Sequence, residues 1–245
     1  MCKRLRNLIR WIMGNIIYIP KGGCLATLPN GLVGYYKLDD TTQTIVDSAG
    51  SNDLTGTNAI LEQTGLLGDC VGFDGTDRVI KGNAAHYNVT WDCVTMSFWV
   101  KFNSVTSSQK LISEFYVDTT NQHVQFTASA SNTSLQLGWA TFGKTSTHTW
   151  SSVLSTGVWF NITISIRISD LTFQTWVNGN IYNETWTALT SATVDKFSGR
   201  TALGRYYSSL LQPFNGYMDD LKIWNRELSQ CEIEANYNSG NGIEL

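Results

Sequence analysis

Alternation of apolar and polar residues with a period of two is the feature that most constrains the fold of this chain. It is clearest over residues 161–168, where four isoleucines alternate with polar residues, and it recurs over residues 94–102. Successive side chains of a β-strand point to opposite faces of a sheet, so each segment predicts a strand with one buried face. A third alternating segment, Leu171–Val177, leads into Asn178-Gly179, which is a strong signal for a β-hairpin.

Many other segments predict short strands separated by turns, whereas the chain beyond residue 30 contains one convincing helix. Ser229 and Glu232 form a capping-box pattern, and Gly240 is a natural end for the helix that follows. About a dozen short strands with turns every 8–12 residues predict a sandwich or jelly roll. The additional strand segments are 32–38, 70–73, 111–117, 123–128, 135–140, 201–204 and 217–224.

Composition agrees with a sheet protein and excludes several other classes. Hydrophobic residues make up 42% of the 245 residues and charged residues only 15%, so the chain can bury a sizeable core. A net charge of −3 and a pI of about 5.6 argue against a nucleic-acid binder. No apolar run is long enough to predict a transmembrane helix.

Residues 1–30 differ from the rest of the chain and predict a basic amphipathic arm. Residues 1–25 carry five bases and no acid, whereas the remaining residues carry 12 bases and 20 acids. The pattern fits a signal peptide, a membrane-surface helix or a partner-docking helix. We favour an assembly arm that docks on its own body, residues 31–245, or on another subunit. Its docking residues are a helically spaced apolar stripe: Leu5, Leu8, Ile9, Ile12, Ile16 and Ile17.

The cysteines predict neither a zinc site nor a disulfide framework. There are five, an odd number, and they are widely spaced, without a CxxC pair or a Cys/His cluster. We therefore expect buried free thiols. The five are Cys2, Cys24, Cys70, Cys93 and Cys231.

Seven short motifs occur in order along the body. They are GLVGYYKLDD (31–40), VDSAGSNDLTG (46–56), VGFDGTDRV (71–79), TMSFWVKF (95–102), WVNG (176–179), ALGRYYSS (202–209) and FNGYMDDLKIWNRELSQCEI (214–233). In this order they resemble the concanavalin A-like, laminin-G-like jelly-roll family. The resemblance implies an all-β fold, a two-sheet antiparallel jelly-roll sandwich of six or seven strands per sheet. Members of the family are mostly glycan- or protein-binding modules, and some relatives cleave glycans.

The body lacks the carboxylate pattern that glycan cleavage requires. Retaining glycosidases use two carboxylates that flank the scissile bond, and the catalytic relatives carry them on one strand in a pattern like ExDxxE. No such pattern occurs here, and segments 94–102 and 161–168 contain no carboxylate. Glu114 and Asp118 are four residues apart, across a probable strand end, and Glu184 is isolated. The histidines show no Ser-His-Asp pattern. We predict that the protein is not an enzyme, with a glycan hydrolase as the alternative.

One loop has the composition of a calcium site. Residues 47–53 are rich in carboxylate, amide and glycine groups, and Ca²⁺ binds such oxygens. The resemblance implies a structural Ca²⁺ between this loop and an acid of the last strand. The predicted ligands are Asp47, Asn52, Asp219 and Asp220. In the alternative interpretation, an acid of the last strand caps a loop by hydrogen bonds and residues 47–53 form a plain turn.

Aromatic residues in polar loops are our candidates for glycan contact. The four candidates are Trp150, Trp186, Tyr206 and Tyr207, which lie in Thr/Ser-rich segments or just before the last strand. Trp99, Trp176 and Trp224 lie in strand motifs, and we expect them to be packing residues. Structural or incidental roles remain the alternative for all four candidates, since isolated exposed aromatics are common.

These observations lead to one functional hypothesis with alternatives. We predict a non-catalytic phage virion protein, a decoration or fibre subunit, that displays a glycan- or surface-binding jelly roll and is attached through residues 1–25. Its partners are other virion subunits and a host-surface glycan, and we expect a homo-oligomer. The alternatives are a bacterial surface adhesin, a glycan-cleaving enzyme, and a capsid cement with a purely structural role.

Overall fold

The computed structural model places most of the body in two stacked antiparallel sheets, as the sequence predicts. It describes residues 28–76, 79–82, 91–105, 108–113, 125–131, 134–141, 144–151, 153–167, 172–181, 186–187, 202–205 and 212–245. The two sheets have nine and eight strands, and we name them sheet I and sheet II. Both exceed the expected six or seven because the count includes four strands that are only two residues long.

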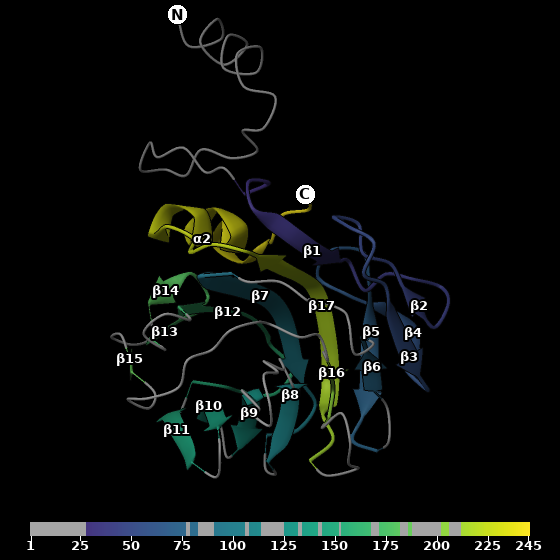
Figure 1. Ribbon diagram of the computed structural model, residues 1–245. Helices are drawn as coiled ribbons and strands as arrows, with labels where there is room; N and C mark the ends of the chain where they lie inside the picture. Colours follow the sequence, from purple (N-terminus) through teal and green to yellow (C-terminus); the bar gives the residue numbers. More distant parts are fainter. Residues whose placement is uncertain are drawn as a thin grey trace, which may run out of the picture.

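Sheet I holds the longest strands, and in Figure 1 its left-hand part lies above the left-hand part of sheet II. Its order is β14 (Asn180–Ile181), β13 (Thr172–Val177), β12 (Trp159–Arg167), β7 (Cys93–Phe102), β17 (Asn215–Trp224), β5 (Asp69–Asp74) and β4 (Ile60–Thr64). In addition, β1 (Leu32–Tyr36) pairs with β17, and β15 (Trp186–Thr187) pairs with β13. The turn at Asn178-Gly179 joins β13 to β14, which confirms the predicted hairpin.

Sheet II forms the second layer. Its order is β11 (Lys144–Trp150), β10 (Ser134–Thr141), β9 (Gln125–Ser131), β8 (Gln109–Ser113), β16 (Ala202–Leu203), β6 (Val79–Lys81), β3 (Leu54–Thr57) and β2 (Thr44–Ile45). Neighbouring strands in both sheets are antiparallel, as in the pairs β12–β7 and β10–β9.

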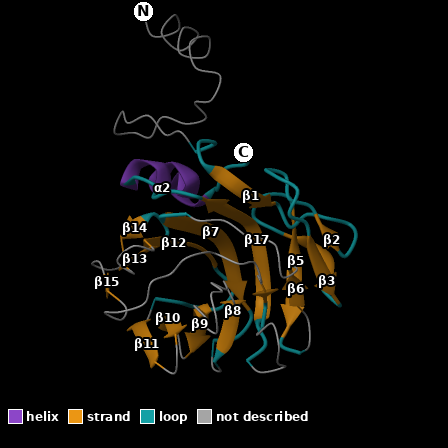
Figure 2. Cartoon of the chain, in the orientation of Figure 1, coloured by secondary structure: helices purple, strands orange, loops and turns teal. Residues whose placement is uncertain are grey.

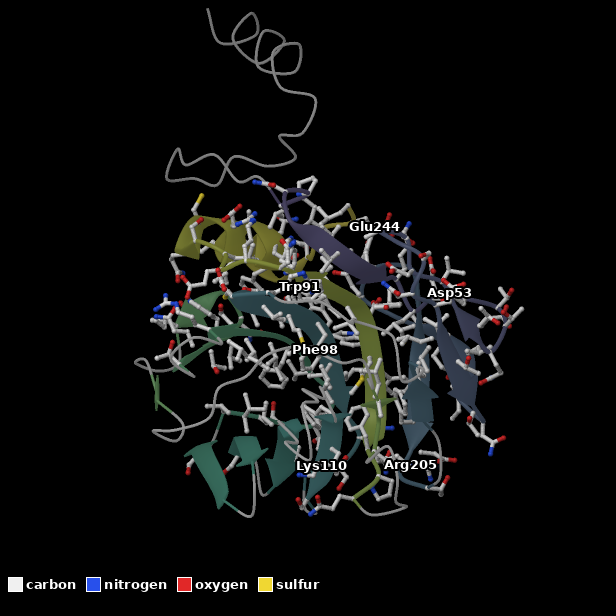
Figure 3. The ribbon with its side chains drawn as sticks, in the orientation of Figure 1. Asp53, Trp91, Phe98, Lys110, Arg205 and Glu244 are labelled. Atoms are coloured by element: carbon white, nitrogen blue, oxygen red, sulfur yellow. The ribbon has the colours of Figure 1, made fainter. Side chains whose placement is uncertain are left out.

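The main core lies between the two sheets. Every second residue of β7 and β12 points into it, as the alternation predicts, including Phe98 and Ile164. Leu111 and Ile112 of β8 meet them from sheet II. Figure 3 shows Phe98 between the two layers.

The other face of sheet I, which we call its outer face, is buried over part of its area. Asn161, Thr163 and Ser165 of β12 are all buried, so the prediction that this strand has one buried face is wrong. The reason is α2 (Gln230–Tyr237), which covers the upper end of this face and is shown in purple in Figure 2. The buried polar side chains are satisfied there, since Ser97 bonds to Asn161, Thr163 and Asn236 of α2.

The sequence correctly predicts how α2 begins. Ser229 caps the helix, and Glu232 completes the capping box. The helix ends at Tyr237, before the expected Gly240, because Asn238 adopts a left-handed conformation with φ 48. A short 3-10 helix, η1 (Asn238–Gly240), and a tail to Leu245 follow.

The docking stripe of the arm, from Leu5 to Ile17, lies outside the described residues. Leu28 is fully buried, and Trp224 donates a hydrogen bond from Nε1 to its carbonyl at 2.6 Å. Packing against the body therefore begins before residue 31. None of the helices that the structure describes is long and apolar enough to span a membrane.

The three described cysteines divide into two kinds. Cys70 and Cys93 are buried free thiols, as expected, and burial raises the pKa of Cys70 to about 12. Cys231 is disulfide-bonded, so the free-thiol prediction is wrong at that position.

Candidate functional site

Three side chains from three strands form a row on the outer face of sheet I, at the end of β7 that points away from α2. Trp159 of β12 and Tyr217 of β17 both lie opposite Lys101 of β7 in the strand register. The Lys101 ammonium lies 4.9 Å from the centroid of the Trp159 ring and 4.6 Å from that of Tyr217. All three side chains are partly exposed. We call this row the aromatic platform.

The cation in the platform is held by the rings on either side. Each ring carries negative charge on its face and attracts the ammonium. Among the described residues Lys101 forms no ion pair with a carboxylate. The platform therefore presents a positive charge between two apolar ring surfaces.

Two amides continue the site along the same face. Asn103 directly follows β7 and Asn215 is the first residue of β17, and the Asn103 Nδ2 donates to the Asn215 Oδ1 at 3.1 Å. Asn103 is exposed and Asn215 is partly exposed. Ring faces beside amide donors and acceptors suit a ligand with apolar C–H surfaces and many hydroxyl groups.

A buried charged pair lies farther along the outer face, beneath α2 and the C-terminal tail. The Lys222 ammonium, with 0% side-chain exposure, contacts the Asp220 Oδ2 at 2.5 Å. It also donates to the Asn236 Oδ1 at 3.1 Å and to the Ile243 carbonyl at 2.6 Å. Burial raises the pKa of Asp220 and lowers that of Lys222, while each charge favours the charged form of the other. The pair joins β17 to α2 and to the tail.

Asp219 has a different role from its neighbour. Its Oδ2 accepts hydrogen bonds from the backbone N–H groups of Leu66 at 2.7 Å and Leu67 at 2.9 Å. The carboxylate is fully buried, and burial raises its pKa to about 7, although the two N–H donors act in the opposite direction. A Cβ on Gly65 would lie 2.6 Å from this Oδ2, so glycine is required where the loop closes over Asp219.

A bulge in β17 places both acids on the outer side. The register shifts between Asp219 and Lys222, and Asp220 has a left-handed backbone with φ 57. Strict alternation would put Asp219 on the face of Leu221 and Asp220 on the opposite face. The bulge resets the phase, so Leu221 points into the main core while Asp219 meets the loop at residues 65–67.

In the loop at residues 47–53, the Asp47 side chain is held by hydrogen bonds from backbone N–H groups. The buried Asp47 carboxylate accepts from the N–H groups of Tyr35, Ala49 and Asn52 at 2.9, 3.1 and 3.2 Å. Asp47 and Asn52 bond to each other within this turn. Asp219 bonds instead to the backbone at residues 66–67, and Asp220 to Lys222. Within the described ranges no group of three or more His, Cys, Asp or Glu residues is arranged to hold a metal. The calcium site stays a prediction, and these contacts match its alternative, a plain turn and a capped loop.

The side chains of all four predicted glycan-contact residues lie outside the part of the chain that the structure describes. Trp150 ends β11 and Trp186 begins β15, but their side chains are outside the described part, as are Tyr206 and Tyr207 altogether. The three tryptophans expected to pack do so, with exposures of 1% for Trp99, 4% for Trp176 and 0% for Trp224. Glu114 and Glu184 lie outside the described residues.

Sequence reasoning missed the aromatic platform. The one available signal was the alternation itself, which places Trp99 and Lys101 on the polar face of segment 94–102. The register that brings Trp159 and Tyr217 beside Lys101 depends on strand pairing between distant segments, which one sequence does not reveal.

Comparisons with known proteins agree with the fold. Residues 74–234 match the laminin-G-type family model of the Concanavalin A-like lectin/glucanases superfamily. No curated protein is significantly similar to this chain in sequence.

Several solved structures share the fold at low sequence identity. The receptor-binding domain of botulinum neurotoxin D superposes with a TM-score of 0.64 at 16% identity, covering 87% of this chain and 54% of that one. Domain 4 of an extracellular arabinanase from Geobacillus stearothermophilus, in complex with arabinotriose, gives 0.60 at 17%, covering 83% and 96%. A Trypanosoma rangeli sialidase in complex with 2,3-difluorosialic acid gives 0.68 at 16%, covering 99% and 40%. This chain thus spans about half of the neurotoxin domain and most of the arabinanase domain.

Proposed function

Since the chain belongs to the Concanavalin A-like lectin/glucanases superfamily, we propose that it is a non-catalytic glycan-binding protein whose ligand lies on the aromatic platform. The observation that carries the proposal is the row of Trp159, Lys101 and Tyr217, which is partly exposed on the part of the sheet face that lies away from α2. A fold alone does not specify a function, so the proposal rests on this site. The arabinotriose complex of the similar arabinanase domain supports a glycan as the ligand class.

The absence of catalysis is part of the proposal. Glycosidic cleavage needs two carboxylates on either side of the bond, within reach of the substrate. Among the described residues, the groups around the platform are two rings, an ammonium and two amides, with Asp74 as the carboxylate opposite Asn215. Asp219 and Asp220 are buried and engaged in other bonds. Incubation with neutral and acidic oligosaccharides should therefore yield no new reducing ends.

Removal of either ring should weaken glycan binding about tenfold or more, because central aromatic residues dominate the energy of binding sites. The variants are Trp159→Ala and Tyr217→Ala, and the measurement is calorimetric titration with the oligosaccharides that bind best in an array. Val158→Ala is the matched control, since Val158 adjoins Trp159 and is 50% exposed. Equal affinity of the ring variants and the control would contradict the proposed site.

We place this protein on a larger assembly, a phage virion, as a decoration or fibre subunit attached through its arm. The support is the basic amphipathic pattern of residues 1–25 beside an acidic body. A bacterial surface adhesin is the second candidate, and the disulfide at Cys231 favours it, because disulfides persist in oxidising surroundings.

Deleting residues 1–25 should leave a soluble, folded jelly roll that no longer joins its assembly. Six apolar stripe residues, buried at about 1.5–3 kcal/mol each, would offset the cost of ordering a short helix. Circular dichroism checks the fold, and sedimentation of the purified particle or cell envelope checks incorporation. Normal incorporation of the truncated chain would show that the arm is not the anchor, and a failure to fold would show that the arm belongs to the core.

A further inference from the structure

We propose that the aromatic platform selects oligosaccharides that carry negative charge, and that Lys101 is the residue that recognises the charge. The inference rests on the glycan-binding function proposed above and names the ligand class of that same site. It follows from the position of one ammonium group and from the charges around it.

The ammonium of Lys101 lacks a carboxylate partner among the described residues, although it is partly buried between two rings. Two carboxylates on nearby strands are engaged elsewhere. Asp219 accepts from the backbone of Leu66 and Leu67, and Asp74 accepts from Thr76, including its hydroxyl at 2.6 Å. A positive charge that the protein itself leaves uncompensated is available to an anion.

The two rings also prepare Lys101 for binding. A lysine on an open surface is flexible and strongly hydrated, so an ion pair there gains little. Here the rings at 4.9 and 4.6 Å restrain the side chain and displace part of its water. An incoming carboxylate or sulfate therefore meets a cation that is already positioned, and the attraction is stronger where less water screens it.

The spacing of the rings indicates an oligosaccharide rather than a single sugar. Trp159 and Tyr217 lie on strands that flank β7, two strand spacings apart, or about 10 Å. One sugar unit covers one ring, so a ligand that contacts both rings must extend across Lys101. Its acidic group then lies at the centre of the row, beside the ammonium, while Asn103 and Asn215 supply hydrogen bonds at the side.

Matched ligand pairs test the inference. Wild-type protein, Lys101→Gln and Lys101→Arg are titrated with oligogalacturonate and its methyl ester, and with a sulfated galactan oligosaccharide and its desulfated form. The wild type should bind the charged member of at least one pair about tenfold tighter, and the responding pair identifies carboxylate or sulfate as the anion. Lys101→Gln should remove this preference, so that its affinities for the charged and the neutral member of the responding pair become equal. Lys101→Arg should retain the preference.

Salt gives a second readout that a purely structural role of Lys101 would not change. Raising the salt concentration from about 0.05 M to about 0.5 M should weaken binding of the charged ligand to the wild type but not to Lys101→Gln. Charge selection is overturned if the wild type binds both members of each pair equally well, or if it binds none of them. It is also overturned if Lys101→Gln keeps the preference for the charged member. If Trp159→Ala binds neither ligand of a pair while Lys101→Gln keeps both affinities, the platform binds glycans but Lys101 does not select for charge. If Trp159→Ala changes nothing, the platform itself is the wrong site.

Discussion

Replacing Lys222 with methionine is expected to destabilise the fold by about 3–5 kcal/mol, because it leaves the Asp220 carboxylate buried without a counter-charge. Asp220 is 2% exposed, and its partner ammonium also bonds to Asn236 and to the Ile243 carbonyl. The substitution thus removes contacts that join β17 to α2 and to the C-terminal tail. Urea denaturation followed by fluorescence measures the loss, and the tryptophans buried near α2 provide the signal.

The double variant Asp220→Asn with Lys222→Met separates the two contributions. In this variant neither position of the pair carries a charge, so it should be more stable than Lys222→Met alone. The double-mutant cycle then measures the coupling energy of the pair. The control is the exposed ion pair of Arg167 and Glu227, whose side chains are 44% and 45% exposed. Arg167→Gln should cost less than about 1 kcal/mol. A similarly small loss in Lys222→Met would mean that the buried pair is not the connection between strand and helix that the geometry indicates.

The alternation in a single sequence predicts the long strands of this fold but not the positions of Asp219 and Asp220. Period-two alternation correctly places the long strands and the residues that β7 and β12 bury between the sheets. It fails at β17, where one residue with φ 57 shifts the phase and brings both acids to the same side. Tertiary contacts stabilise this bulge, namely the hydrogen bonds of Asp219 to the loop and the ion pair of Asp220. The local sequence therefore does not predict it.

The outer face of sheet I illustrates a second limit. Asn161, Thr163 and Ser165 have the composition of a solvent-facing strand surface, and local sequence predicts that they are exposed. They are buried because α2, predicted correctly from its capping box, folds back over them and supplies Asn236 as a partner for Ser97. The sequence identifies the helix but does not reveal the surface that it covers.

The candidate site is less predictable than the fold for the same reason. No local pattern marks the three platform residues in the sequence. They form a site only because the register of three paired strands places Trp159 and Tyr217 on either side of Lys101. Aromatic residues in Thr/Ser-rich loops are easier to notice, so they were the predicted contacts. Partly exposed aromatics on paired strands are a better guide once the pairing is known, because a sheet fixes their spacing.

Stability should decrease as the pH rises from about 5 to about 7.5, and the ionisation of Asp219 should contribute to the decrease. Burial raises the pKa of Asp219 to about 7, whereas an unfolded aspartate has a pKa of about 3.9. Between these values the folded protein keeps the proton that the unfolded chain releases, so the free energy of unfolding falls with pH and levels off above the folded pKa. Three pKa units correspond to about 4 kcal/mol at most.

Asp219→Asn isolates this effect. Asparagine retains an oxygen that accepts from the N–H groups of Leu66 and Leu67 but does not titrate, so its stability should change much less across the same pH range. Glu232, whose pKa is lowered to about 2, affects stability only at more acidic pH, so it does not obscure the comparison. Asp69→Asn, at an exposed neighbouring position, should keep the wild-type slope. Equal slopes in wild type and Asp219→Asn would mean that Asp219 stays ionised in the folded protein, with the backbone donors at residues 66–67 outweighing its burial.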